Sequence, residues 1–470
     1  MSTVSFPPDF LFGVATSSYQ IEGAANDDGR GESIWDRFAR QPGAIADRSD
    51  GSVACDHYRR WADDLDLMKW LGVDVYRFSI AWPRVLPEGR GRVEPRGLDF
   101  YDRLVDGLLA RGIRPAATLY HWDLPQALQD RGGWAARATV DAFVEYTAVV
   151  VERLGDRVAT WMTHNEPWCV SILGHRSGEH APGLKDVGTS LRVAHHVLLS
   201  HGRAVPVIRA LAPRAEVGIV LNLVPGEPAS PSAADLEATR RFDGEFNRWF
   251  CDPLFHARYP ADAVEDYRKA GVGGVLDDLI QPGDLAEIAV PTDFLGVNYY
   301  SRLVLRSNAI PESENLPRVV HLEPEQTDMG WEVKAEGLGM LLDRIHRDWG
   351  PKRIYIAENG CAYGDAPGAD GRVPDVRRIY FLDSHLRAVQ AAVRRGIPVA
   401  GYFLWSMLDN FEWAYGFSKR FGIFWVDYET QRRVPKDSAR WYREVIARRA
   451  MDSQPFPRPA PSTAMVGGPV

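Results

Sequence analysis

The sequence predicts an α/β fold with one domain, in which eight parallel strands and their helices close into a (β/α)8 TIM barrel with elaborated loops. Short apolar runs alternate with amphipathic helical stretches along the 470 residues. The apolar runs carry hardly any charge, as is typical of parallel strands that are covered on both faces. We expect strands at Phe10–Ala15, Val73–Ile80, Ile113–Tyr120, Val158–Thr163, Val217–Leu223, Phe294–Tyr299, Ile354–Ala357 and Val399–Trp405.

Helical patterns lie between the predicted strands and end at glycines. From Phe100 to Leu108 apolar residues recur every four positions, and Gly112 follows; the stretch 379–393 stops before Gly396. Glycine just past the last periodic residue is a C-cap signal. Repeated β-then-α units favour the closed barrel. The alternative, an open doubly wound sheet, normally has a glycine-rich phosphate loop after the first strand, and GVATSSYQIEG is not one.

Loops rich in proline and glycine follow several predicted strands, and we expect them to border the functional face of the barrel. They span Trp82–Pro95, Val224–Pro231, Ser307–Met329 and Tyr363–Pro374. Residues 1–451 then form the barrel domain. Residues 452–470 are rich in Pro, Ser and Gly and are predicted to be a disordered tail.

The composition argues against several classes of protein. The net charge is −8, the pI is about 5.9, and no basic stripe occurs, which argues against nucleic acid binding. No stretch approaches the length of a membrane span, and the N-terminal segment lacks the pattern of a signal peptide. The four cysteines form no CxxC pair, which predicts neither a disulfide framework nor a zinc site. We therefore expect a cytoplasmic protein without a membrane partner.

Polar or aromatic residues stand at or just past the ends of the predicted strands. Because the carboxyl ends of barrel strands meet at one face, these side chains should converge on one pocket. Each also has a purely structural interpretation, which is as good as the functional one for Asn222. In chain order the residues are Gln20, Arg77, His121, Glu166, Asn222, Tyr300, Glu358 and Trp405.

Glu166 and Glu358 indicate a specific chemistry. They end the fourth and seventh predicted strands, which lie roughly opposite in a barrel, so two carboxylates can flank one bond. Such a pair provides the nucleophile and the acid/base that cleave a glycoside. We expect Pro167 to hold Glu166 in extended geometry. We also expect Asn359-Gly360 to turn the chain sharply with a positive φ.

The chain contains, in this order, FLFGVATSSYQIEG, YRFSIAWPRVLPEG, TLYHWDLPQAL, NEPW, FLGVNYYS, IAENG and WSMLDNFEWAYGFSKRFGI. Through these motifs, residues 6–447 closely resemble family 1 of the glycoside hydrolases, the β-glucosidase family. The resemblance implies a TIM barrel and a retaining double displacement, with Glu358 as nucleophile and Glu166 as acid/base. It also implies that Arg77 and Tyr300 touch the nucleophile.

The same resemblance assigns further residues to substrate binding. It implies contacts with the glycone sugar from Gln20, His121, Asn165, Trp405, Glu412 and Trp413, where Trp405 is the platform under the ring. It implies pocket lining from Trp122, Asn298, Trp331 and Phe421, where Trp331 is an aromatic wall of the aglycone site. Trp168 and Leu173 should line the entrance and limit product inhibition by glucose, although plain packing explains Leu173 equally well.

The implied activity is a retaining β-glucosidase that acts on terminal β-D-glucosyl residues of cellobiose, short cello-oligosaccharides and aryl or alkyl β-glucosides, as in cellulose degradation. Side activity on β-galactosides and β-fucosides and transglycosylation are expected; no cofactor or metal is implied, and a homo-oligomer is left open. Thioglucosidases replace Glu166 by Gln, and 6-phospho-β-glycosidases place Ser at position 412, where Glu412 would repel a phosphate. A non-catalytic carbohydrate-binding barrel and a transglycosylase remain alternatives.

The chain departs from the usual family pattern at three positions, none of which removes a catalytic group. They are His164 before the NEP motif, Cys361 after the ENG motif and Ala335 in the WEV stretch. We expect His164 to be buried in the barrel interior, where its charge would shift the pH profile of the acid/base.

Overall fold

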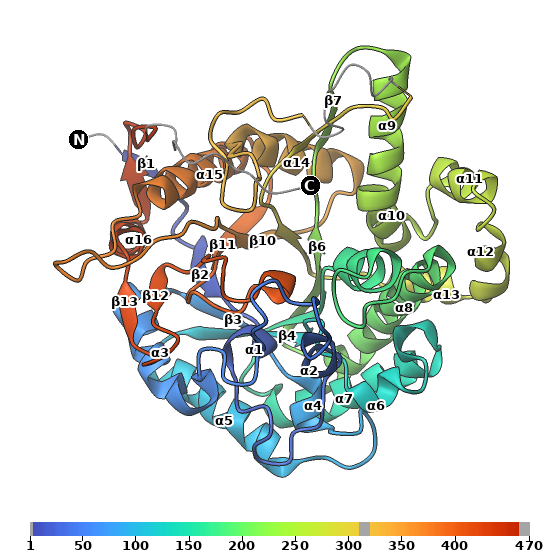
Figure 1. Ribbon diagram of the computed structural model, residues 1–470, viewed down its shortest axis with the longest axis horizontal. Helices are drawn as coiled ribbons and strands as arrows, with labels where there is room; N and C mark the ends of the chain where they lie inside the picture. Colours follow the sequence, from blue (N-terminus) through green and yellow to red (C-terminus); the bar gives the residue numbers. More distant parts are fainter. Residues whose placement is uncertain (1–2, 310–319, 460–470) are drawn as a thin grey trace.

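The computed structural model describes residues 3–309 and 320–459. Parallel strands form a closed barrel at its centre (Figure 1), which confirms the predicted fold class. Around the barrel the strands are β10 (Ile354–Asn359), β11 (Val399–Trp405), β2 (Leu11–Ala15), β3 (Val75–Ser79), β4 (Arg114–Tyr120), β5 (Thr160–Asn165), β6 (Glu216–Asn222) and β8 (Phe294–Asn298).

Apolar side chains fill both sides of the barrel wall. Inside, Val75, Met162, Val220 and Phe403 belong to one buried cluster. Outside, a larger cluster joins the strands to the surrounding helices. Because both faces of each strand are covered, the strands appear in the sequence as nearly continuous apolar runs.

Helices surround the barrel (Figure 1), and two of them are the ones that the apolar spacing predicts. Gly112 and Gly396 follow these two helices with φ of 75° and 88°, the left-handed geometry expected of a C-cap glycine. The long helices are α3 (His57–Leu71), α5 (Pro95–Ala110), α7 (Ala138–Leu154), α8 (Val187–Leu211), α14 (Ala335–Asp348), α15 (Val376–Arg394) and α16 (Asp437–Arg448).

Shorter elements lie in the loops. The α-helices are α1 (Ser18–Ile21), α2 (Ile34–Ala39), α4 (Trp82–Val85), α6 (Gln126–Gln129), α9 (Ala233–Asp243), α10 (Trp249–His256), α11 (Ala261–Lys269), α12 (Gly274–Leu279) and α13 (Asp284–Ile288). The others are 3₁₀-helices η1 (Gly133–Ala135) and η5 (Trp413–Tyr415), π-helices η2 (Cys169–Ser177) and η3 (Gly244–Arg248), and strands β7 (Gly226–Pro228), β9 (Leu303–Leu305), β12 (Phe424–Val426) and β13 (Arg433–Pro435).

Two barrel strands extend further than predicted, and both extensions carry site residues. β5 continues to Asn165, and β10 continues through Glu358 to Asn359. The register of β5 with β6 and of β10 with β8 shifts near these ends, which lets pairing continue past the apolar run. Asn165 and Glu358 are therefore held by the barrel wall itself.

The two ends of the described chain pair with each other. β1 (Thr3–Ser5) runs antiparallel to β14 (Ala450–Asp452). The segment that we predicted as a tail thus begins within a strand, and the backbone N–H of Phe456 donates to Asp383 on α15. Residues 460–470, the rest of the predicted tail, lie outside the described residues, and so does the centre of the predicted loop Ser307–Met329.

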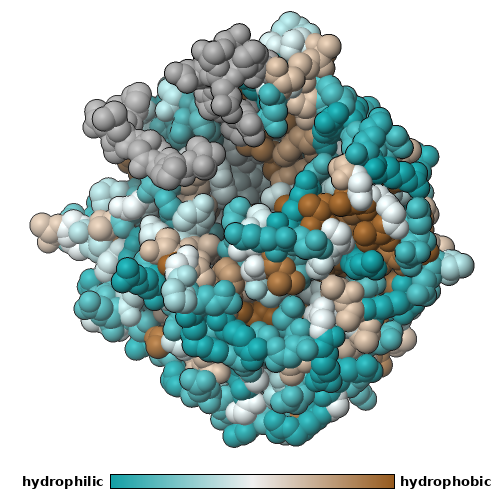
Figure 2. All heavy atoms as spheres, turned by 45° about the vertical axis from the view of Figure 1, so that its right-hand side comes forward, coloured by the Kyte–Doolittle hydropathy of each residue, from teal (hydrophilic) through white to brown (hydrophobic). Residues whose placement is uncertain are grey.

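Helix length, the cysteines and the surface bear on what the composition predicted. No helix within 3–309 and 320–459 is long and apolar enough to cross a membrane. The four cysteines are free and buried. Hydrophilic residues predominate on the face shown in Figure 2, and apolar residues gather there in a few patches, the broadest at the right.

Candidate active site

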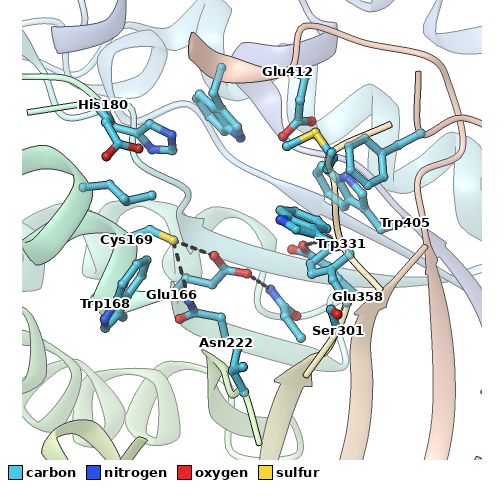
Figure 3. Close-up of a pocket in the computed structure, with 18 of the residues that line it drawn as sticks. Glu166, Trp168, Cys169, His180, Asn222, Ser301, Trp331, Glu358, Trp405 and Glu412 are labelled. Carbon is cyan, nitrogen blue, oxygen red and sulfur yellow. Dashed lines mark hydrogen bonds between the residues drawn. The ribbon is translucent and has the colours of Figure 1, made fainter. Parts of the chain in front are cut away.

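A cavity of about 360 Å³ opens where the barrel strands end. Glu166 and Glu358 both line it, with Glu166 to the left of Glu358 in the close-up of Figure 3. The other predicted site residues that line it are His121, Trp122, Trp168, Leu173, Asn298, Tyr300, Trp331, Trp405, Glu412, Trp413 and Phe421. The predicted residues Gln20, Arg77 and Asn165 lie behind this lining and bond to it.

Glu358 is held by a cation and a phenol. Arg77 Nη1 donates to Glu358 Oε1 at 2.6 Å, and Tyr300 Oη donates to Oε2 at 2.6 Å. Arg77 Nη1 also donates to the carbonyl oxygen of Ala357 at 3.0 Å, which fixes the guanidinium against β10. The Glu358 side chain is only 4% exposed, so these two bonds fix the orientation of both carboxyl oxygens at the cavity wall.

Glu166 follows β5 with a φ of 50°, so the expectation that Pro167 keeps it extended is wrong. Its backbone N–H still bonds the carbonyl oxygen of Val220 on β6 at 2.9 Å, and π-helix η2 starts three residues later. The chain must leave the sheet at once to enter η2, and the left-handed turn accomplishes this. Trp122 and Trp413 also line the cavity with φ of 77° and 48°; such backbone strain is common at active sites.

The Glu166 carboxyl group is held by neutral donors. Asn298 Nδ2 donates to Oε1 at 2.5 Å, and the Cys169 thiol donates to Oε2 at 2.9 Å. Burial, and then the negative charge of Glu358, raise the pKa of Glu166 to about 7. Near neutral pH this carboxyl group therefore exists in both protonation states, as a group that gives and takes a proton requires.

Asn165 joins the two sides of the site. Its Oδ1 accepts from Arg77 Nη2 at 2.7 Å and from Asn298 Nδ2 at 3.1 Å, while its Nδ2 contacts His121 Nε2 at 3.1 Å. Burial and the charge of Arg77 lower the pKa of His121 well below its usual value. The His121 ring is therefore neutral and, since Nε2 accepts, carries its proton on Nδ1.

Glu412 is a third carboxyl group on the cavity wall. Gln20 Nε2 donates to Glu412 Oε2 at 3.5 Å and to the Phe411 carbonyl oxygen at 2.8 Å, which ties the first predicted motif to the last. Burial and the charges of Glu358 and Glu166 raise the pKa of Glu412 to about 8. The deep end of the cavity is therefore dense in groups that bond hydroxyls.

Aromatic rings border the same deep end and continue to the mouth. The His121 ring stacks on the rings of Trp405 and Trp413, with a distance of 5.9 Å between ring centroids in each pair. Towards the outside, Trp168 packs on Phe246 at 4.3 Å. Together with Leu173, Val224, Leu303, Met329 and Trp331, these residues give the outer cavity an apolar wall.

Two further expectations are corrected by the structure. Gly360 does not have the positive φ that we expected; instead a Cβ there would lie 1.6 Å from the Trp405 carbonyl oxygen, so glycine is required by close backbone approach. His164 lies outside the barrel wall rather than inside it, stacked on Phe143 of α7 and bonded to Ser200 of α8 at 2.8 Å. Burial lowers the pKa of His164 well below its usual value, so it remains neutral.

Sequence reasoning missed several residues that line the cavity: Cys169, Glu179, His180, Phe246 and Tyr415. Cys169 and His180 lie on and after η2, the segment that follows the NEP motif. The resemblance predicted that Leu173 of this segment lines the entrance, but neither spacing nor composition indicated that Cys169 and His180 reach the cavity as well. Asn222, which the sequence left undecided, also lines the cavity. Within the described residues, no group of three or more His, Cys, Asp or Glu side chains is arranged to hold a metal ion.

The sequence model of glycosyl hydrolase family 1 matches residues 2–451. The chain is 50% identical to β-glucosidase A of Acetivibrio thermocellus over 95% of this chain and 99% of that protein. It is 42% identical to the bifunctional β-D-glucosidase/β-D-fucosidase of Bifidobacterium breve, over 95% of this chain and 99% of that protein. The solved structure of a family 1 β-glucosidase from Thermotoga maritima superposes with a TM-score of 0.91 at 44% identity, covering 96% and 100% of the chains.

Proposed function

The chain belongs to glycosyl hydrolase family 1, and from this premise we propose that it is a retaining β-glucosidase that uses Glu358 as nucleophile and Glu166 as acid/base. Its substrates are terminal β-D-glucosyl residues of small glycosides such as cellobiose, short cello-oligosaccharides and aryl or alkyl β-glucosides. The observation that carries the proposal is that two carboxyl groups on one cavity have different surroundings. Glu358 is paired with Arg77, whereas Glu166 has a pKa of about 7.

The geometry suits a double displacement. Glu358 attacks the anomeric carbon while Glu166 gives its proton to the leaving oxygen, which forms a covalent glycosyl-enzyme. Glu166, now ionised, then takes a proton from water, and this water releases the sugar with retained configuration. Tyr300 and Arg77 keep both oxygens of Glu358 oriented during attack.

The distribution of polar groups along the cavity supports a small sugar at depth and a less polar aglycone at the mouth. Glu412, His121 and Asn298 provide bonding partners for hydroxyls, and Trp405 provides a stacking surface. Trp331, Trp168 and Phe246 border the outer part, where an aromatic or alkyl group loses water-exposed apolar surface on binding.

Stereochemistry at the anomeric carbon tests the mechanism directly. The first sugar released from an aryl β-glucoside, followed by proton NMR before mutarotation, should be the β-anomer. Early accumulation of the α-anomer would show inversion and contradict the proposal. The isosteric variant Glu358→Gln should release no sugar, which would also exclude a non-catalytic carbohydrate-binding barrel for the parent.

Substrate range is the finer part of the proposal. The Bifidobacterium breve relative is named for both glucosidase and fucosidase activity, which supports side activity on β-fucosides here. Values of kcat/KM for β-glucosides, β-galactosides, β-fucosides and cellobiose would rank these substrates. Product analysis at high substrate concentration would separate hydrolysis from transglycosylation, which uses the same intermediate.

The entrance residues form a separate test. We propose that Trp168 and Leu173 narrow the outer cavity and so limit glucose inhibition. Glucose titrations of Trp168→Ala and Leu173→Ala should show stronger inhibition than the parent. The control is Leu109→Ala, an exposed leucine on α5 that is away from the cavity. Unchanged inhibition in all three variants would mean that Leu173 and Trp168 serve packing only.

Location and organisation complete the proposal. Four free cysteines suit a reducing compartment, so we propose a cytoplasmic enzyme whose barrel domain spans residues 1–451. Cell fractionation and limited proteolysis of the purified chain would test these two points.

A further inference from the structure

Glu166 is bound differently from Glu358. In the part of the chain that the structure describes, no Arg or Lys forms a salt bridge with Glu166; its two oxygens instead receive one neutral donor each, from Asn298 and Cys169. Figure 3 shows dashed lines from the Cys169 sulfur to both the Glu166 carboxyl group and Asn222. The distance from Asn222 Nδ2 to the sulfur is 3.7 Å.

The direction of each bond around Oε1 follows from the chemistry of Arg77. A guanidinium has only donors, so Asn165 Oδ1, which receives Arg77 Nη2 at 2.7 Å, must accept. The same Oδ1 contacts Asn298 Nδ2 at 3.1 Å, so Asn298 must present its NH₂ group there. That NH₂ group also contacts Glu166 Oε1 at 2.5 Å. Oε1 therefore faces an obligate donor and is a poor place for a proton.

Oε2 of Glu166 faces the Cys169 thiol, which can act as a hydrogen-bond donor or as an acceptor. A thiol donates through its S–H and accepts, weakly, through its sulfur lone pairs. Cys169 remains a thiol because burial, and then the charge of Glu166, raise its pKa well above the usual value. It can donate S–H to an ionised Oε2 and can lie beside a protonated Oε2 without a clash of two donors.

We propose that Cys169 is a positioning residue for the acid/base: with Asn298 fixed as donor to Oε1, the Cys169 thiol confines the transferable proton to Oε2 and then stabilises the carboxylate that remains after transfer. In the first step the Oε2–H bond breaks and the proton goes to the glycosidic oxygen, whose bond to the anomeric carbon breaks as Glu358 bonds to that carbon. The S–H group then donates to the new negative charge on Oε2. This inference rests on the proposed function and specifies how its acid/base works.

The pH dependence of kcat/KM tests this role, because its basic limb reports the ionisation of the free acid/base. Cys169→Ala removes the donor to the ionised form, so the basic limb should move to higher pH by about half a unit to one unit. Cys169→Ser keeps a donor of similar shape and stronger hydrogen bonding, so its limb should lie at or below that of the parent. The matched control is Cys251→Ala, a buried cysteine on α10 outside the cavity, whose limb should coincide with that of the parent.

A second measurement separates positioning from packing. In a Glu166→Gln background, which has no ionisable acid/base, Cys169→Ala should leave the rate on activated aryl β-glucosides unchanged within about twofold, whereas a packing role would lower it in both backgrounds. Basic limbs that coincide in Cys169→Ala, Cys169→Ser and the parent would overturn the inference, and so would equal shifts in both variants. The proposed function fails separately, if Glu166→Gln slows all leaving groups alike.

Discussion

The two sides of the cavity hold a carboxyl group by opposite means. On the β10 side, Glu358 is bound by the Arg77 guanidinium and the Tyr300 hydroxyl, each at 2.6 Å. On the β5 side, Glu166 is bound by an amide and a thiol and has a pKa of about 7. A fixed cation suits a group that must stay negative until it attacks, and neutral partners suit a group that must change its charge twice in each turnover.

The largest loss of activity should come from substituting Glu358, the carboxyl group that is paired with Arg77. Glu358→Ala removes the nucleophile, and we expect kcat for an aryl β-glucoside to fall by about 10⁴-fold or more. External azide or formate should restore turnover by attacking in the space left by the carboxylate, and the product should be the inverted α-anomer. An α-azide product from Glu166→Ala instead would reverse the two assignments.

Substituting Glu166, which is bound by neutral donors, should lower kcat/KM by an amount that depends on the leaving group. Glu166→Gln cannot donate a proton, so substrates with poor leaving groups, such as cellobiose, should lose about 10²–10⁴-fold in kcat/KM. Activated aryl glucosides need little protonation and should be affected far less at this step. A leaving-group series measured on parent and variant gives the comparison, and equal slowing across the series would contradict the acid/base role.

A smaller effect should follow when only the orientation of the nucleophile is loosened. Tyr300→Phe removes one bond to Glu358 while Arg77 remains, and the loss of a bond to a charged group, about 1.5–3 kcal/mol, corresponds to about a 10- to 150-fold lower kcat/KM. Tyr299→Phe is the matched control, because the Tyr299 hydroxyl donates to the Lys334 carbonyl oxygen. Equal kinetic losses in both variants would show that Tyr300 acts through folding alone.

The smallest effect concerns stability. The pKa of Glu166 rises from an ordinary value of 4.5 to about 7 in the folded protein, so between these values the unfolded chain loses this proton before the folded one does. The contribution of protonated Glu166 to the free energy of unfolding is therefore fully present below about pH 4 and is lost as pH rises towards 7. Glu166→Gln removes this loss and should raise Tm by about 2–4 °C at pH 8 with no change at pH 4. A pH-independent difference in thermal denaturation scans would contradict this.

The sequence was sufficient for the barrel because its strands are buried on both faces and its helices end at glycines, signals that are local to each segment. It also placed Glu166, Glu358 and Arg77 around one cavity, since strand ends converge in this topology. It could not show the left-handed turn at Glu166, nor which side chains of η2 reach the cavity besides Leu173. Cys169 was missed for that reason: its contact with Glu166 depends on the path of the chain after this turn, which neither spacing nor composition reports.

Thr3 and Asp452 are neighbours across an antiparallel pair, which places the first and last ordered strands within one inter-strand spacing of each other. A short peptide bridge from Asp452 to Thr3 would therefore suffice in a circularly permuted enzyme that omits residues 1–2 and 453–470, and this enzyme could begin in an exposed loop on the helical exterior.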